Sequence, residues 1–298
     1  MRAFAWFVGL ILVGLASIAV FTYPLWTLLH PHFGFPFHRL GERIGMVVLL
    51  LVFAAAAPRL GVGDRVSLGF GLPRRAFLRE MATGLALGVL TMAAIVAVMT
   101  ALGLLEWTRS PHVARLVLMS LSSGLAAALI EETFLRGAML TAIERESGST
   151  PAVLATAAVY SATHFFASYH IAAAEVTAGS GLDLLRGTLQ AFANPGGIAD
   201  AFLCLFAVGV VLAVIRVVTG NIAACIGLHA GWVWVMLTVH GLSAPVRTAP
   251  LRFLLSRFDG FVGWLVLAWT VLIGFALWRF YARGASRSSR ATGSSISR

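Results

Sequence analysis

The stretch GLAAALIEETFLRGAMLTAI, residues 124–143, places two adjacent glutamates inside an apolar run that is long enough to cross a bilayer. Glu131 and Glu132 interrupt this run, and Arg136 follows about one helical turn after Glu132. An ionised carboxylate in hydrocarbon costs roughly 2.5–3.5 kcal/mol on insertion scales, so such residues persist mainly where they have a function. The stretch therefore predicts a membrane helix that carries a functional site.

The composition of the whole chain is typical of a polytopic membrane protein. Of the 298 residues, 59% are hydrophobic and 11% are charged, and the mean hydropathy is +0.90. All 22 basic residues are arginines, and they are spread over the loops and the C-terminal tail. This distribution argues against nucleic-acid binding, and a chain without lysine cannot form a lysine-bearing phosphate loop. We therefore expect the lipid bilayer as a partner, and neither a nucleic acid nor a nucleotide.

Apolar runs of about twenty residues predict an all-α integral membrane protein with about eight transmembrane helices. The run at 44–58 is short, and whether it crosses the membrane fully stays open. The region 182–192 has mixed polarity and is either an amphipathic helix along the interface or an ordinary loop. The eight candidate spans are 4–28, 44–58, 82–105, 114–135, 151–169, 198–218, 221–240 and 260–280.

The arginines also predict an orientation and a division of the chain. With the N-terminus inside, fourteen arginines fall on the inner side and eight on the outer side, so both termini are expected in the cytoplasm. We expect N-terminal transmembrane helices with a basic cytoplasmic loop at 1–113 and a membrane core at 114–240. An outer loop with the last transmembrane helix follows at 241–282, and a disordered basic tail at 283–298.

The two glutamates are expected to have different roles, because neighbouring residues point about 100° apart around a helix. Glu132 lies four residues before Arg136, the spacing and order that favour an ion pair within the helix. Glu131 would then face a cavity. Helix geometry alone leaves the reverse assignment open, and all three residues could instead be solvated anchors at the cytoplasmic lip.

Two histidines in later spans extend this polar set. His164 and His229 lie in separate apolar runs, and a Glu/His/His set can hold and deprotonate a water molecule. Glu131, His164 and His229 would also be the ligands of a divalent metal such as zinc, if one is present. The sequence lacks an H-E-x-x-H pair and a G-x-S-x-G elbow. Cys204 and Cys225 have no metal-ligand spacing.

With these residues in place, the chain resembles the CPBP family (CAAX protease and bacteriocin-processing, Abi-type) of intramembrane endopeptidases. Glu131-Glu132-Thr-Phe-Leu-Arg136-Gly137 matches the family's E-E-x-x-x-R and trailing glycine. Tyr160-Ser-Ala-Thr-His164 matches F-x-x-x-H, with tyrosine in place of phenylalanine. The segment from Thr219-Gly220-Asn221 to Gly227-Leu228-His229-Ala230-Gly231-Trp232 is close to the third motif. The resemblance covers about residues 114–240.

The resemblance implies a four-helix catalytic core that hydrolyses a peptide bond inside the membrane and is reached from the cytoplasm. Glu131 would be the general base, helped by His164. His229 would bind the water or stabilise the oxyanion. No cofactor is required on this reading. The predicted catalytic residues are Glu131, Glu132, His164 and His229, with Arg136 and Tyr160 in support.

One position departs from the family pattern. The family commonly has asparagine or aspartate four residues after the last histidine, and this chain has Val233. The departure predicts a weak enzyme, a substitute donor, or a catalytically silent member. Trp232 and Trp234 could supply an indole N–H, whereas Asn221 lies two turns before His229.

The sequence thus predicts an intramembrane endopeptidase acting on a membrane-associated peptide or protein, in a prokaryotic inner membrane. A catalytically silent scaffold or immunity protein is the alternative. A proton-coupled transporter is a further alternative, in which the buried glutamate and histidines form a relay. The lack of an internal repeat argues against the transporter.

Overall fold

A computed structural model describes residues 2–166 and 169–293, and these residues form a bundle of helices with one small sheet. The predicted all-α fold class is confirmed. The two strands, β1 (Leu105–Trp107) and β2 (Ser243–Pro245), pair antiparallel, with Glu106 opposite Ala244. The helices are α1 (Arg2–Phe33), α2 (Phe37–Ala56), α3 (Arg74–Ala101), α4 (Val113–Glu132), α5 (Leu140–Ser147), α6 (Ser149–Thr163), α7 (Ser180–Ala193), α8 (Pro195–Thr219), α9 (Ala223–Leu242) and α10 (Trp264–Gly293).

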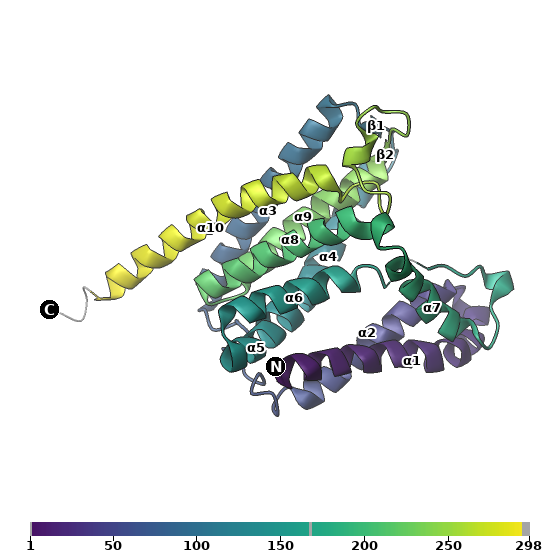
Figure 1. Ribbon diagram of the computed structural model, residues 1–298, viewed down its shortest axis with the longest axis horizontal. Coiled ribbons are helices and arrows are strands. Elements are labelled where there is room, and N and C mark those ends of the chain that lie inside the picture. The colour runs from purple at the N-terminus through teal and green to yellow at the C-terminus, as the bar shows by residue number, and fades with distance from the viewer. Residues whose placement is uncertain (1, 167–168, 294–298) are drawn as a thin grey trace.

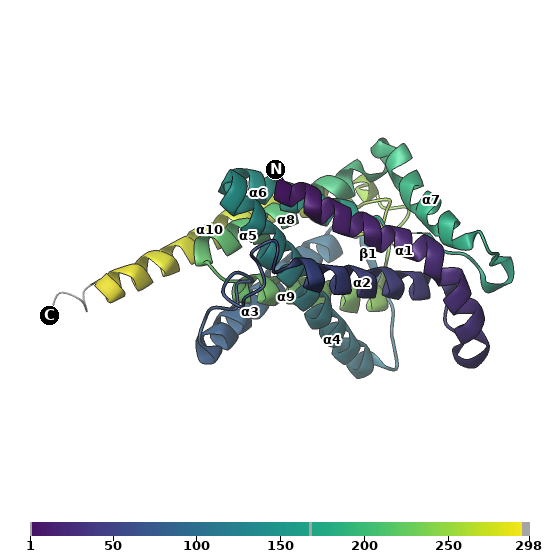
Figure 2. The ribbon, with the colours of Figure 1, turned by 90° about the horizontal axis from the view of Figure 1, so that it is seen from below.

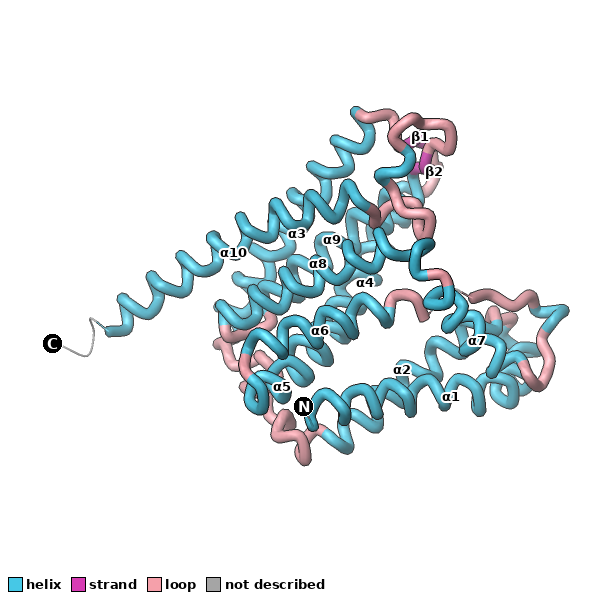
Figure 3. Tube along the Cα trace, viewed as in Figure 1, coloured by secondary structure: helices cyan, strands magenta, loops and turns pink. Residues whose placement is uncertain are grey.

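The helices of the core form two layers. Figure 1 shows α10, α8 and α6 side by side, with α3, α9 and α4 behind them. The helices α1, α2 and α7 lie to one side, where α1 packs against both of the others. Figure 2 shows from below that α3 and α4 diverge from α9, which packs against both. Most connecting loops gather at the two ends of the helices, as Figure 3 shows.

Six helices of the described residues are long and apolar enough to cross a membrane, and they cover six of the eight predicted spans. The runs 44–58 and 151–169 fall largely in α2 and α6, although residues 167–168 lie outside the described part of the chain. The first turns of α2 carry charged side chains, and α6 has only 15 residues. At 1.5 Å per residue α6 is roughly 22 Å long, less than the ~30 Å hydrocarbon core of a bilayer.

The closest helix packing is between α3 and α9, and glycines make it possible. A Cβ atom at Gly227 would lie 2.0 Å from the carbonyl oxygen of Met81, and one at Gly88 would lie 2.5 Å from that of Leu228. Small residues four apart let two helix backbones approach closely in a membrane, where helix packing replaces the hydrophobic effect as the driving force. This contact fixes the position of α9, which carries His229.

The loop between α2 and α3 closes one end of the core. Ser67 accepts a hydrogen bond on its carbonyl oxygen from the Thr141 hydroxyl, at 3.0 Å. Arg145 donates to the carbonyl oxygen of Gly61 at 2.6 Å, and the backbone N–H of Ile222 donates to Gly69 at 3.1 Å. A segment outside the predicted core therefore joins the end of α5 to the start of α9.

Two other regions were left open or predicted differently. The region 182–192 is helical, because it lies within α7, and α7 packs against α1. α10 continues to Gly293, so residues 283–293 are helical where the sequence predicted a disordered tail. Extending a formed helix needs no new nucleation, which favours this continuation. Residues 294–298, the rest of that predicted tail, lie outside the described residues.

Candidate active site

The centre of the site is a buried ion pair on one continuous helix. Glu132 ends α4, and the next seven residues, Thr133–Met139, form a π-helical segment before α5. Arg136 Nη1 donates to Glu132 Oε1 at 2.9 Å, and both side chains are fully buried. The predicted pair between these residues is therefore present. The alternative in which all three residues are solvated anchors at the membrane lip is wrong for Glu132 and Arg136, because neither side chain reaches solvent.

Three helices hold Arg136 in place. Its Nη2 donates to the carbonyl oxygen of Gly209 in α8 at 3.2 Å, and its guanidinium carbon lies 4.7 Å from the ring centroid of Tyr160 in α6. Gly209 permits this arrangement, because a Cβ atom there would lie 2.8 Å from the Cα of Ala157. The π-helical segment carries Arg136 at the meeting point of these helices, and such segments are common at functional sites.

His229 connects the two glutamates. Its Nδ1 lies 2.8 Å from Glu132 Oε1, and its Nε2 lies 3.9 Å from Glu131 Oε2. A carboxylate can only accept, so Nδ1 carries a proton and donates the hydrogen bond to Glu132 Oε1. The 3.9 Å separation is too long for a direct hydrogen bond. Glu131 is the more accessible of the two carboxylates, since 37% of its side chain is exposed.

His164 and Tyr160 form the opposite wall of the site. His164 follows the last residue of α6, and its Nδ1 lies 2.7 Å from the carbonyl oxygen of Tyr160. A carbonyl oxygen only accepts, so Nδ1 is the donor and Nε2 is free for other partners. The Tyr160 ring lies 4.4 Å from the His164 ring and 5.8 Å from the His229 ring, measured between centroids. Tyr160 thus contacts both histidines and Arg136.

The two histidines share an apolar cavity of about 110 Å³. Tyr160, Val233 and Asp259 also line it, and the remaining walls come mainly from α3, α8, α9 and α10. This volume is several times what one water molecule needs. Glu131 is not among the described residues that line the cavity, but its Oε2 lies 3.9 Å from Nε2 of His229, which does line it. Val233 faces the cavity one turn after His229, at the position where a hydrogen-bond donor was expected.

The donors considered as substitutes for that position are all engaged elsewhere. Trp232 Nε1 donates to the Thr91 hydroxyl at 2.9 Å, and Trp234 Nε1 donates to the carbonyl oxygen of Val117 at 3.0 Å. The idea that either indole replaces the missing donor is therefore wrong. Asn221 caps the start of α9, because its Oδ1 accepts from the backbone N–H of Ala223 at 2.9 Å.

The described residues do not gather a metal site. No group of three or more His, Cys, Asp or Glu side chains within residues 2–166 and 169–293 is arranged to hold a metal ion. Glu131, His164 and His229, the ligands expected if a metal is present, are therefore not arranged as a ligand set in the structure, and His229 Nδ1 is bound to Glu132.

The sequence reasoning missed Asp259 as a cavity residue. It lies in the segment RFDGFVGW, just before α10, and an acidic residue next to an apolar span was the available signal. The π-helical form of Thr133–Met139 was also not predicted, and nothing in its residue types distinguishes it from an α-helix.

Part of the chain matches a known protein family. Residues 113–235 match the family model described as "Type II CAAX prenyl endopeptidase Rce1-like". The matched segment contains all three motifs and closely follows the predicted core at 114–240. A search of curated proteins and a search of solved structures found no match.

Proposed function

Because residues 113–235 match the model of the Rce1-like family of type II CAAX prenyl endopeptidases, we propose that this integral membrane protein is an intramembrane endopeptidase whose water is activated by Glu131. The observation that carries the proposal is the chain of contacts from Arg136 through Glu132 to His229 and on to Glu131. The first two contacts fix the orientation of the His229 ring. In the last one, a water lying beside the line that joins Nε2 and the Glu131 carboxylate can bridge the two atoms.

In the first step Glu131 acts as general base. A water held between Glu131 Oε2 and His229 Nε2, which are 3.9 Å apart, is within hydrogen-bond reach of both atoms. Its oxygen attacks the carbonyl carbon of the scissile peptide bond while its proton passes to Glu131. The carbonyl oxygen becomes an oxyanion. In the second step the carbon–nitrogen bond breaks, and Glu131 returns the proton to the leaving amine.

His164 is the residue best placed to stabilise the oxyanion. Its Nδ1 is bound to the Tyr160 carbonyl oxygen, so Nε2 is the nitrogen left for the cavity that His164 lines. When both ring nitrogens carry a proton, His164 presents an Nε2–H there. A preorganised donor of this kind is worth about 10²–10³ in kcat. His164 would thereby replace the donor that Val233 does not supply.

The test compares processing by wild type, Glu131→Gln and His164→Ala in cells at matched expression. The readout is the set of membrane-associated peptides and uncleaved precursors, followed by mass spectrometry. Precursors should accumulate in both variants. Glu106→Gln is the matched control, since Glu106 is an exposed glutamate in β1 and should leave processing unchanged. Identical peptides in all four strains would overturn the enzymatic reading.

A catalytically silent scaffold that binds a peptide is the second candidate, and Val233 is the observation in its favour. A scaffold needs a cavity but no general base. Its cellular phenotype would therefore survive Glu131→Gln and be lost when the cavity is filled, for example by Val233→Trp. The protease predicts the loss of the phenotype with either variant.

The proposed setting follows from the chemistry and the charge pattern. The substrate is a membrane-associated peptide or protein, since the site lies within the helices that span the bilayer. We place the protein in a prokaryotic inner membrane with both termini in the cytoplasm, supported by fourteen inner and eight outer arginines. The resident partner is the lipid bilayer, and the mechanism above requires no cofactor.

A further inference from the structure

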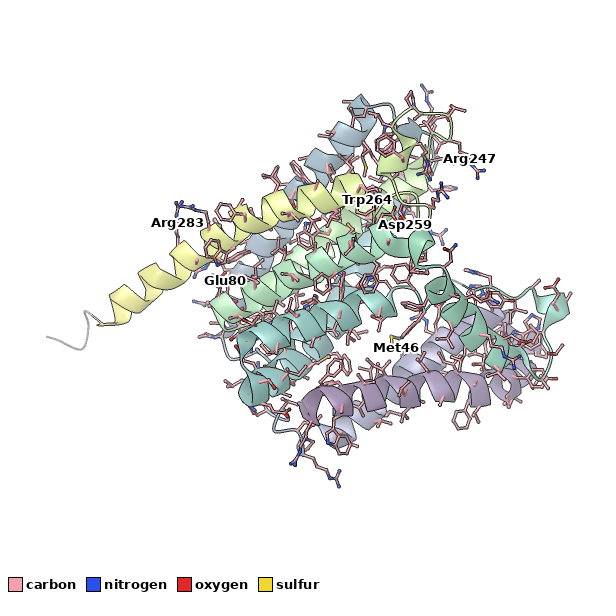
Figure 4. All side chains as sticks on the ribbon, in the orientation of Figure 1. Met46, Glu80, Arg247, Asp259, Trp264 and Arg283 are labelled. Atoms are coloured by element: carbon pink, nitrogen blue, oxygen red, sulfur yellow. The ribbon has the colours of Figure 1, made fainter. Side chains whose placement is uncertain are left out.

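An acidic residue from outside the matched family segment lines the cavity together with the two histidines. Asp259 lies in the loop between β2 and α10 and lines the cavity together with His164 and His229. Figure 4 places it beside the start of α10, next to Trp264, at the end of the bundle that carries β1 and β2. The mechanism proposed above does not use this side chain.

The Asp259 carboxylate is held firmly but is not neutralised. Its Oδ1 accepts from the backbone N–H groups of Phe261 and Val262, at 2.9 Å and 3.0 Å. No arginine or histidine forms an ion pair with it among residues 2–166 and 169–293. Burial raises the pKa of this carboxyl, and the two backbone hydrogen bonds and the charge of His240 only partly offset the effect. A half-buried anion without a cationic partner is costly, and a bound cation would remove that cost.

The apolar walls and the volume of the cavity determine which kind of cation can bind there. The cavity has a volume of about 110 Å³, and its walls include Val262, Val266 and Trp269. Trp269 donates its own N–H to the carbonyl oxygen of Thr91 at 3.0 Å. A bare metal ion would find too few ligands, as no metal-binding group occurs in the described part of the chain. An apolar stem that ends in a charged head matches both parts of the cavity.

We propose that Asp259 binds the cationic end of a lysine or arginine side chain of the substrate peptide, whose methylene stem occupies the apolar part of the cavity. This inference rests on the proposed function, because it names the substrate class of that same site. The peptide bond attacked at His229 and Glu131 would then lie at a fixed distance along the chain from the basic residue. Asp259 makes the enzyme selective for a basic residue close to the cleavage point.

Binding can be tested without any cleavage. The full-length protein in detergent is heated with n-hexylammonium chloride or with n-hexanol at neutral pH, and unfolding is followed by tryptophan fluorescence. The amine should raise Tm more than the alcohol for wild type, and Asp259→Asn should respond equally to both. The exposed Asp183 gives the matched control, Asp183→Asn, which should keep the preference. Equal responses in wild type, or a preference retained by Asp259→Asn, would overturn the inference.

Cleavage gives the second readout and separates this inference from the proposed function. A randomised peptide library is compared with the same library in which norleucine replaces lysine and arginine. Wild type should cleave the basic library about tenfold faster, the order expected of one charge-assisted hydrogen bond. Asp259→Asn should cleave both at similar rates. If wild type cleaves both libraries at equal rates, the proposed specificity for a basic residue is overturned, but the proposed protease function is not. If the amine raises Tm more than the alcohol but wild type cleaves no faster than Glu131→Gln, the protease function is overturned. The cavity would then bind a cation without catalysing cleavage.

Discussion

Glu131 and Glu132 are neighbours in the sequence, yet their surroundings in the fold are opposite. Glu132 is fully buried between Arg136 and His229, whereas 37% of the Glu131 side chain is exposed. This difference assigns Glu132 to orienting the histidine and leaves Glu131 free to exchange a proton. Of the two assignments that helix geometry left open, the contacts favour the one with Glu131 as base.

The two glutamates should therefore respond differently to the same substitution. Glu132→Gln leaves Arg136 buried without its counter-charge, and breaking a buried pair costs about 3–5 kcal/mol of unfolding free energy. Glu131→Gln should change stability by less than about 0.5 kcal/mol, as expected of an accessible side chain. Both variants should lose peptide hydrolysis. Equilibrium unfolding in detergent checks the difference, and equal stabilities would contradict this division of roles.

Val233 offers a test by gain of function. Val233→Asn places an amide donor on the cavity wall one turn after His229, where the developing oxyanion could accept from it. We expect kcat to rise by about tenfold, less than the 10²–10³ that a fully preorganised donor supplies. Val233→Leu, which adds volume but no donor, should not raise kcat. Single-turnover kinetics in detergent would measure the effect, and no gain with Asn would assign the oxyanion to another donor.

Asp259 should make stability depend on pH in a defined direction. Burial raises its pKa, so the folded state binds a proton more tightly than the unfolded state does. Protonation of Asp259 therefore stabilises the folded state. This contribution is complete at roughly pH 4 and below, the ordinary pKa range for aspartate, and it is lost as the pH rises through the raised pKa. At pH 7 Asp259→Asn should therefore be more stable than wild type, and the difference should shrink toward pH 4. Thermal unfolding across this range checks the sign, and a less stable variant at pH 7 would contradict it.

At the scale of elements, the contact between α3 and α9 positions His229. Gly84 and Gly88 face Gly227 and Gly231, and backbone atoms of each helix fill the space where the other's side chains would be. His229 lies between the two glycines of α9, so its reach toward Glu132 in α4 depends on this close approach. The glycine spacing was visible in the sequence, but which helices it joins was not.

Alanine at Gly227 should disrupt this contact. Its Cβ would lie 2.0 Å from the carbonyl oxygen of Met81, so the helices must separate, at a cost of about 1–3 kcal/mol or more. Hydrolysis should fall as His229 moves. Gly9→Ala is the matched control in α1, where nothing lies within 4 Å of the added carbon. That control should stabilise the helix by about 0.5–1 kcal/mol. If Gly227→Ala and Gly9→Ala have the same free energy of unfolding, the close contact between α3 and α9 does not stabilise the protein.

At the scale of the whole molecule, the site connects helices from two layers and a loop from beyond the family segment. Residues 113–235 supply the glutamates and histidines, while the α2–α3 loop closes one end and Asp259 enters from the other. Figure 4 shows Arg247 near that second end and Arg283 toward the opposite end of α10. The orientation of the protein in the bilayer therefore determines which of these two ends faces the cytoplasm.

Cysteine labelling can check the orientation. Arg65→Cys lies in the exposed α2–α3 loop, which we place in the cytoplasm, and Arg247→Cys lies in the exposed segment after β2, which we place outside. The native Cys204 and Cys225 are buried and should not react with the maleimide. In intact cells a membrane-impermeant maleimide should label only Arg247→Cys, and Arg65→Cys should react after permeabilisation. The opposite pattern would invert the topology.

The sequence by itself determined the membrane class, the helical fold, the family of the core and the pairing of Glu132 with Arg136. These features depend on hydropathy and on spacing within one helix, so local patterns suffice. Only the tertiary structure decided that His229 joins Glu132 across 97 residues, that the indoles of Trp232 and Trp234 are engaged elsewhere, and that Asp259 enters the cavity. Contacts of this kind depend on how helices distant in the chain pack together, and no local pattern records that geometry.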